Sequence, residues 1–190
     1  MRRILVSVFC CVCFLCAHAS ATVLAPIEFR QLVTSSPVIV HGTVVDVRSD
    51  WVDGRRTVET FVTVDAGDYL KGDLGPRITF KVPGGQIGRY RTIFVGAPTF
   101  QTGDELVLFL KSNGPSYPFI TGLSQGLFRV VADRTSGRRL VTPPAVVGKP
   151  GVDERVVRGD SARRPVPLDD FRALVRQMET TRAPGRGRDR

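Results

Sequence analysis

The sequence predicts a mainly β protein: a small antiparallel OB-like barrel or sandwich with a short N-terminal helix and a C-terminal helix. Several short runs are rich in β-branched and aromatic residues, and turn signals separate them. This spacing is typical of small barrels and sandwiches. One segment on either side of these runs has apolar residues at helical spacing. The turn signals are Asp53-Gly54, Gly84-Gly85, Gly103-Asp104, Asn113-Gly114 and Gly122.

The first residues predict a secretory signal peptide. Arg2 and Arg3 precede an apolar run over 4–16, and small residues follow it. The run is shorter than the roughly 20 residues that a membrane-spanning helix needs. We therefore expect cleavage after Ala19 or Ala21, a secreted or periplasmic protein, and no transmembrane segment after cleavage. An uncleaved membrane anchor is the alternative.

The elements after the signal are predicted from local patterns. Residues 27–34 predict a short helix, which a Ser-Ser-Pro sequence ends. Residues 38–47 and 57–64 predict strands, and Asp53-Gly54 between them favours a two-residue hairpin turn. In that register Trp51 lies across from Arg56 and Val45 across from Val62, so that the valines of both strands share one face. The register gives no reason for Phe61 on the polar face.

Later strands are expected over 77–82, 92–95, 106–110, 117–121 and 127–131, with one more hairpin around residues 135–137. Residues 169–180 predict a helix that docks on the barrel. The predicted organisation is a signal peptide over 1–19, a β-barrel domain over 22–142, a loop over 143–166, a C-terminal helix over 167–181 and a disordered basic tail over 182–190.

Cysteine and charge limit the possible functions. All four cysteines lie between positions 10 and 16, so the mature chain is expected to be cysteine-free, without disulfides or thiolate ligands. The formal net charge is +9. Export argues against nucleic acid as a partner, and a basic chain favours an exported acidic protein or an anionic envelope surface. A solvated surface that keeps the chain soluble explains the charge as well.

Four motifs suggest chemistry, and each has a simpler interpretation. The glycines at 84, 85 and 88 are followed by a strand, which indicates a bend and not a phosphate loop. Residues 122–126 match the G-x-S-x-G pattern around Ser124, but the only mature histidine, His41, comes earlier in the chain. Asp65, Asp68 and Asp73 lack the pattern of a calcium loop. The Arg-Gly-Asp tripeptide at 158–160 arises easily in an Arg- and Gly-rich segment.

Residues 27–131 carry the elements GTV, LKG, PGG, GAP-x-F and LFL in this order. In these elements the chain resembles a family of exported bacterial proteins of uncharacterised function. In outline it is also similar to the netrin-like OB barrels that include tissue inhibitors of metalloproteinases. Some members of the first family are encoded near matrixin-like proteases, which implies an inhibitor or folding partner of such a protease. Those inhibitors bind zinc through an N-terminal cysteine that this mature chain lacks, so no site residue carries over.

The mature sequence contains no complete catalytic or metal set, so we predict a non-enzymatic β-barrel that binds a protein or the envelope. No cofactor and no metal are expected. Two alternatives remain: an inhibitor or folding partner of a co-exported matrixin-like metalloprotease, and a hydrolase that uses Ser124. Trp, Tyr and Arg most often anchor interfaces, although these residues are also ordinary in turns. The possible partner-binding residues are Trp51, Arg55, Arg56, Gln86, Arg89 and Tyr90.

Overall fold

The computed structural model describes residues 26–112, 114, 116–144 and 164–180. The predicted signal peptide, the Arg-Gly-Asp tripeptide and the basic tail lie outside the described residues. Within the described ranges, no helix is both long enough and apolar enough to cross a membrane.

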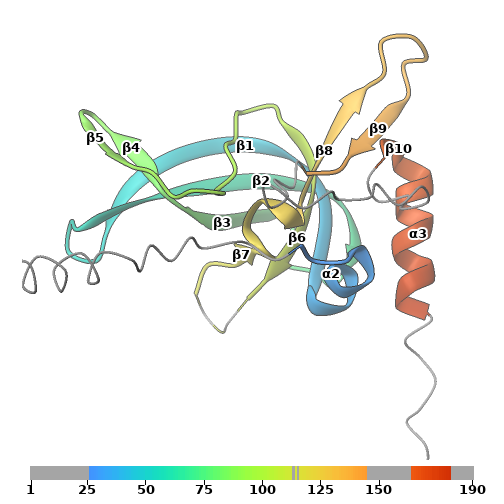
Figure 1. The fold of residues 1–190 in the computed structure, drawn as a ribbon, viewed down its shortest axis with the longest axis horizontal. Helices are drawn as coiled ribbons and strands as arrows, with labels where there is room; N and C mark the ends of the chain where they lie inside the picture. The colour runs from blue at the N-terminus through green and yellow to red at the C-terminus, as the bar shows by residue number, and fades with distance from the viewer. Residues whose placement is uncertain (1–25, 113, 115, 145–163, 181–190) are drawn as a thin grey trace, which may run out of the picture.

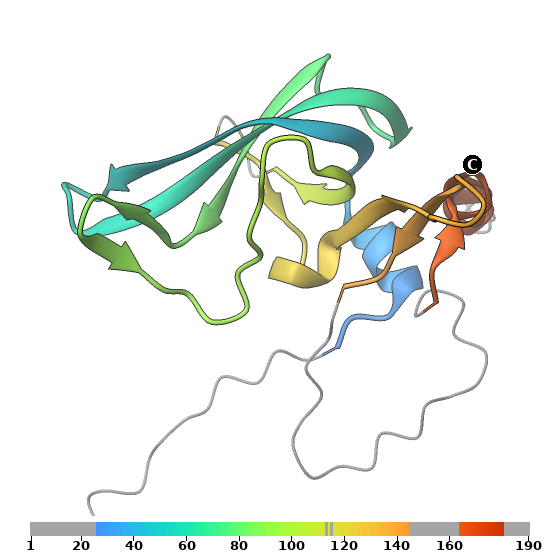
Figure 2. The ribbon, with the colours of Figure 1, turned by 90° about the horizontal axis from the view of Figure 1, so that it is seen from above.

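Five strands form a partly closed, barrel-like ring (Figures 1 and 2). Around the ring the order is β1-β2-β3-β7-β6, and β6 pairs again with β1. The pairing of β3 with β7 is parallel, and the others are antiparallel. The predicted mainly β, OB-like class is therefore confirmed. The strands are β1 (Val38–Val52), β2 (Thr57–Lys71), β3 (Arg77–Pro83), β6 (Glu105–Lys111) and β7 (Phe119–Ile120).

The remaining elements extend the ring at its two ends. At one end β8 (Leu127–Ala132) pairs with β6, and β9 (Arg139–Thr142) and β10 (Val166–Pro167) follow in the sheet. The helices α2 (Phe29–Ser35) and α3 (Leu168–Thr180) lie at this end, close to the positions that the sequence predicted (Figure 1). At the other end β4 (Gly85–Ile87) and β5 (Tyr90–Thr92) form a separate hairpin. A short 3-10 helix, η1 (Leu123–Gly126), joins β7 to β8.

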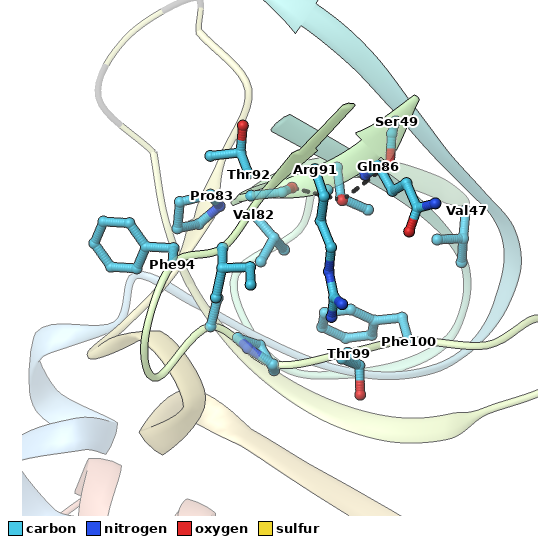
Figure 3. A pocket seen from close by; sticks show the side chains of 16 residues that line it. Val47, Ser49, Val82, Pro83, Gln86, Arg91, Thr92, Phe94, Thr99 and Phe100 are labelled. Atoms are coloured by element: carbon cyan, nitrogen blue, oxygen red, sulfur yellow. Dashed lines mark hydrogen bonds between the residues drawn. The ribbon is translucent and has the colours of Figure 1, made fainter. Parts of the chain in front are cut away.

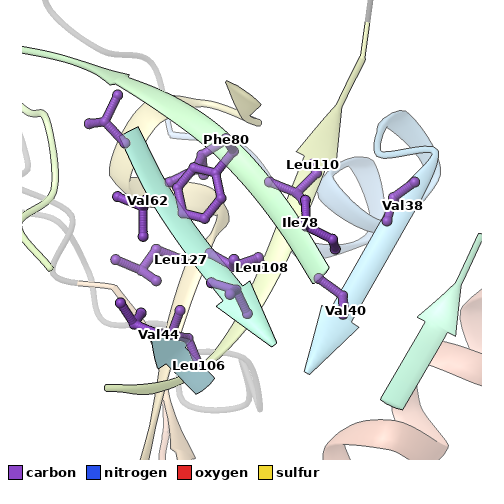
Figure 4. Packing of buried hydrophobic residues seen from close by; sticks show 13 residues of the cluster. Val38, Val40, Val44, Val62, Ile78, Phe80, Leu106, Leu108, Leu110 and Leu127 are labelled. Atoms are coloured by element: carbon purple, nitrogen blue, oxygen red, sulfur yellow. The ribbon is translucent and has the colours of Figure 1, made fainter. Parts of the chain in front are cut away.

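Two hydrophobic clusters hold this arrangement. The inner cluster fills the ring with side chains such as Val62, Phe80 and Leu108 (Figure 4). The outer cluster packs Phe109 of β6 against Phe171 of α3 and the residues of α2 around Phe29. Strand β6 is therefore covered on both faces, which explains its uninterrupted apolar sequence.

The predicted two-residue hairpin is wrong. The turn between β1 and β2 has four residues, because Val52 pairs with Thr57. Asp53, Gly54 and Arg55 all have positive φ angles. The register differs by two residues from the prediction, so that Val47 faces Val62 and Arg48 faces Phe61.

A β-bulge then changes the face of one valine. The pairing slips between Val44 and Asp46, which leaves Val45 as the extra residue. Val44 takes the expected place of Val45 in the core, and Val45 is 36% exposed while Val62 is fully buried. The prediction that Val45 and Val62 share the core face is therefore wrong.

The register also explains Phe61, for which the sequence offered no reason. The ring of Tyr117 lies edge to face against Phe61, with centroids 5.3 Å apart. The guanidinium of Arg48, the direct cross-strand neighbour, lies 5.2 Å from the Phe61 ring centroid. Phe61 thus belongs to a small surface cluster outside the barrel core.

Candidate functional site

Two hairpins meet at the end of the barrel that is remote from α3. The ring of Trp51 on β1 lies edge to face against Tyr90 on β5, with centroids 5.5 Å apart and an interplanar angle of 66°. The backbone N–H of Gln86 on β4 donates to Ser49 Oγ at 3.3 Å. The structure therefore brings together the two loops that carry the six predicted partner-binding residues. Trp51 packs on Tyr90 and not on Arg56 as the predicted register suggested.

The other predicted residues lie around this ring pair. Arg55 and Arg56 are exposed on the four-residue turn. Arg89 lies over Tyr90, its guanidinium carbon 5.2 Å from the ring centroid and Nη2 3.2 Å from the phenol oxygen. Gln86 donates from its side chain to the carbonyl of Gly88 within the β4–β5 hairpin at 3.1 Å. The result is an exposed surface of aromatic rings and arginines.

Glycines seat the β4–β5 hairpin on the barrel wall. A Cβ atom at Gly85 would lie 2.7 Å from Ser49 Oγ and 2.8 Å from Thr60 Oγ1, closer than real Cβ contacts allow. Thr60 Oγ1 donates to the carbonyl of Gly84 at 2.7 Å. These glycines permit a close backbone approach and a change of direction. No helix follows Gly88, so the geometry is a bend, as the sequence predicted, and not a helix N-terminus that could hold a phosphate.

A pocket of about 400 Å³ opens between this hairpin, the barrel wall and the loop over 93–100 (Figure 3). Its apolar lining includes the buried Val82 and the half-buried Val47 and Phe100. Phe100 is held from behind by Phe80 of the inner core, with ring centroids 5.5 Å apart. The volume is within the range of pockets that bind small ligands or side chains.

The loop that closes the pocket exposes an apolar segment that the sequence placed in a strand. Strand β5 ends at Thr92, so the predicted strand over 92–95 is wrong. Ile93, Phe94 and Val95 are 70%, 49% and 89% exposed. The sequence signal for a loop was Gly96-Ala97-Pro98 directly after only three apolar residues. Three consecutive exposed apolar side chains are unusual on a solvated loop.

The far end of the same loop is fixed to the barrel. Arg129 of β8 donates from Nη2 to the carbonyl of Thr99 at 2.6 Å, and its Nη1 pairs with Asp104 at 2.7 Å. Asp104 in turn accepts from the backbone N–H of Gln101 at 2.9 Å. The exposed apolar segment is thus presented by a loop with a fixed base.

The residues around Ser124 form a turn that has a structural role. Gly122 and Leu123 adopt positive φ angles, and a 3-10 helix and then a strand follow. The buried Gln125 accepts a hydrogen bond from the backbone N–H of Ile27 at 2.6 Å, which ties the N-terminal segment to this turn. A nucleophile elbow requires a strand-to-helix turn, which is not the geometry here.

The His41 side chain contacts Glu105 and Arg172. Its Nε2 lies 2.7 Å from Glu105 Oε1, and its Nδ1 lies 3.4 Å from Arg172 Nη2 of α3. A guanidinium can only donate, so the contact with Arg172 fits a neutral imidazole whose Nδ1 accepts and whose Nε2 donates to Glu105. No hydrogen bond joins Ser124 to His41 among the described residues.

The three aspartates that are close in sequence, Asp65, Asp68 and Asp73, each bind a different partner. Asp65 accepts from Arg77 Nε at 2.7 Å, and this hydrogen bond holds the pKa of the Asp65 carboxyl below its ordinary value. Asp68 pairs with Arg172 at 3.1 Å, and Asp73 accepts from the backbone N–H of Gly75 at 2.7 Å. In the part of the chain that the structure describes, no group of three or more His, Cys, Asp or Glu side chains is arranged to hold a metal.

Comparison with known proteins found no matching family model, no matching curated protein and no matching solved structure. The resemblance to exported bacterial proteins and to netrin-like barrels therefore remains an expectation from the sequence.

Proposed function

We propose that this chain is an exported, non-enzymatic β-barrel that binds another protein through its hairpin end, defined as residues 51–57 and 84–95. The observation that carries the proposal is the exposed segment Ile93-Phe94-Val95, which directly follows strand β5 with its Tyr90–Trp51 ring contact and contributes Ile93 and Phe94 to the lining of an open pocket. Burial of these apolar side chains by a partner would supply a driving force for binding.

The composition of the hairpin end fits a protein interface. Aromatic residues and arginine are enriched at the centres of interfaces, and here Tyr90 already contacts both Trp51 and Arg89. Their contacts limit the rotamers that binding would have to fix, which lowers the entropic cost of association. An anionic envelope surface would bind the arginines, but a protein partner explains the exposed apolar segment better.

Capture of exported proteins from the same organism tests the proposal. The bait is the mature chain, compared with a Trp51→Ala, Arg89→Ala, Tyr90→Ala variant and with a Phe94→Ser, Val95→Ser variant. We expect both variants to lose the captured partner. The matched control is Val131→Ser, because Val131 is also exposed but lies on β8 at the other end of the barrel (Figure 1). Equal capture by folded hairpin variants would contradict the proposal.

Two further measurements separate the alternatives. Binding to anionic lipid vesicles that is insensitive to Phe94→Ser, Val95→Ser would favour an envelope surface over a protein partner. Labelling by a fluorophosphonate probe that Ser124→Ala abolishes would favour a hydrolase. If the captured partner is a metalloprotease, its residual proteolytic activity distinguishes an inhibitor from a folding partner.

A further inference from the structure

Among the described residues, Arg91 is the single charged residue that lines the pocket at the hairpin end. Its side chain leaves β5 and extends into the pocket (Figure 3), and no aspartate or glutamate of the described ranges lines the same space. Arg91 makes no hydrogen bond or ion pair with any residue in the described ranges. The pocket therefore contains one positive charge without an internal counter-charge.

Other arginines around the barrel already have partners within the chain. Arg77, Arg129 and Arg139 form ion pairs at 2.7, 2.7 and 3.0 Å with acidic neighbours. Arg89 is stacked on Tyr90 outside the pocket. A guanidinium beside low-dielectric walls interacts with an anion more strongly than one on an open surface does. Arg91 is thus the best placed of these cations to select a negatively charged ligand.

The uncharged residues that line the pocket indicate which other groups a ligand should carry. Val47, Val82 and Phe100 provide the apolar part of the lining, and Phe100 lies next to the end of the Arg91 side chain (Figure 3). The hydroxyl of Thr60 is already committed as donor to Gly84, so in the 3.4 Å contact between Ser49 and Thr60 the proton comes from Ser49. This contact is long for a hydrogen bond between hydroxyls, which leaves Ser49 able to donate to a ligand oxygen instead.

We propose that this pocket recognises an acidic side chain, flanked by apolar residues, on the protein partner, with Arg91 binding the carboxylate. The inference rests on the proposed function, because it assigns the chemistry of the partner that the hairpin end binds. Guanidinium and carboxylate match in shape and charge through two parallel hydrogen bonds. The pocket is continuous with the exposed Ile93-Phe94 segment, which lines it, so a partner that covers this segment also reaches Arg91.

A pair of peptides that differ only in charge tests the assignment. The probes are acetyl-Leu-Asp-Leu-amide and acetyl-Leu-Asn-Leu-amide, titrated into the ¹⁵N-labelled mature chain and followed by amide chemical shifts. We expect the aspartate peptide to bind roughly tenfold more tightly, with shifts at Ser49, Gln86 and Arg91, because a charge-assisted hydrogen bond replaces a neutral one. Arg91→Gln should remove this preference, and Arg91→Lys should retain only part of it.

The control is Arg134→Gln, since Arg134 is exposed on the turn between β8 and β9, lies outside the hairpin end and does not line the pocket. The Arg134→Gln variant should keep the preference. Equal affinity for the two peptides, or an unchanged preference in Arg91→Gln, would overturn the proposal. Acetate that binds as tightly as the aspartate peptide would assign the pocket to free carboxylates and would overturn it as well.

The peptide titration and partner capture together distinguish a failure of this proposal from a failure of the proposed function. Because Arg91 is exposed, its variants are expected to fold, which the unfolding midpoint checks. Partner capture that Phe94→Ser, Val95→Ser abolishes but Arg91→Gln leaves unchanged would contradict only the acidic-ligand proposal. Loss of the peptide preference in Arg91→Gln, together with unchanged capture in both variants, would contradict the proposed function and leave an acidic-peptide pocket.

Discussion

The indole of Trp51 and the phenol ring of Tyr90 are in edge-to-face contact, although they belong to two different hairpins of the barrel. This contact joins the tip of the β1–β2 ribbon to the β4–β5 hairpin. It also places the only tryptophan of the chain at the centre of the candidate interface. Fluorescence of Trp51 therefore reports directly on the arrangement of the two hairpins.

The ring contact should be measurable as a coupling energy. We expect Trp51→Ala and Tyr90→Ala each to lower the free energy of unfolding, and the double variant to lose less than the sum. The coupling should be about 0.5–1.5 kcal/mol, which is typical of an edge-to-face aromatic pair. Urea denaturation of the four proteins, followed by circular dichroism, measures it. Strict additivity would mean that the rings do not stabilise the hairpin contact.

Gly85→Ala should displace the β4–β5 hairpin. The added methyl would meet Ser49 Oγ and Thr60 Oγ1 at less than 3.0 Å, and overpacking of this kind costs about 1–3 kcal/mol. We expect a lower unfolding midpoint and a change in Trp51 fluorescence as Tyr90 moves away. Gly88→Asn is the control, because Gly88 has open space around it and a left-handed φ that asparagine tolerates. If both variants behave alike, the close approach at Gly85 is not what seats the hairpin.

The β-bulge predicts opposite results for two valines in the same ribbon. Val62→Ala removes methyl groups from the inner core and should lower the free energy of unfolding by about 2 kcal/mol. Val45→Ala should change it by less than about 0.5 kcal/mol, because Val45 is the bulged, partly exposed residue. Chemical denaturation of both variants measures the difference. A large loss at Val45 would indicate the regular ladder without the bulge.

The turn between β8 and β9 should respond to acid. Hydrogen bonds from the Ser136 hydroxyl and the Thr135 N–H hold the pKa of the Asp133 carboxyl below its ordinary value of 3.8. A carboxyl with a lowered folded pKa stabilises the fold above its ordinary pKa, and the contribution is lost as pH falls through the folded pKa. We expect an NMR titration midpoint for Asp133 below 3.8, and Ser136→Ala should raise it. A midpoint that Ser136→Ala leaves unchanged would show that the hydroxyl does not stabilise the carboxylate.

The sequence by itself determined the class of the fold and most of its elements. Alternation of apolar residues over 77–82 and helical spacing over 169–180 are local patterns, and the structure has β3 and α3 there. The continuous apolar run over 106–110 is also a local pattern, and it predicted the strand that the structure has as β6 and buries on both faces. These features depend on which face of a short segment is apolar, and that information lies within the segment.

Only the tertiary structure decided the register and the site. A period of two does not reveal a bulge, so nothing in the pattern around Val45 showed that one residue would be left over. The exposed Ile93-Phe94-Val95 segment has the composition of a strand, but in the described structure it pairs with no neighbouring strand. The meeting of Trp51 with Tyr90 requires Gly85 to approach Ser49 and Thr60, which belong to two other strands. Such an approach depends on contacts between segments distant in sequence, and local propensity carries no information about them.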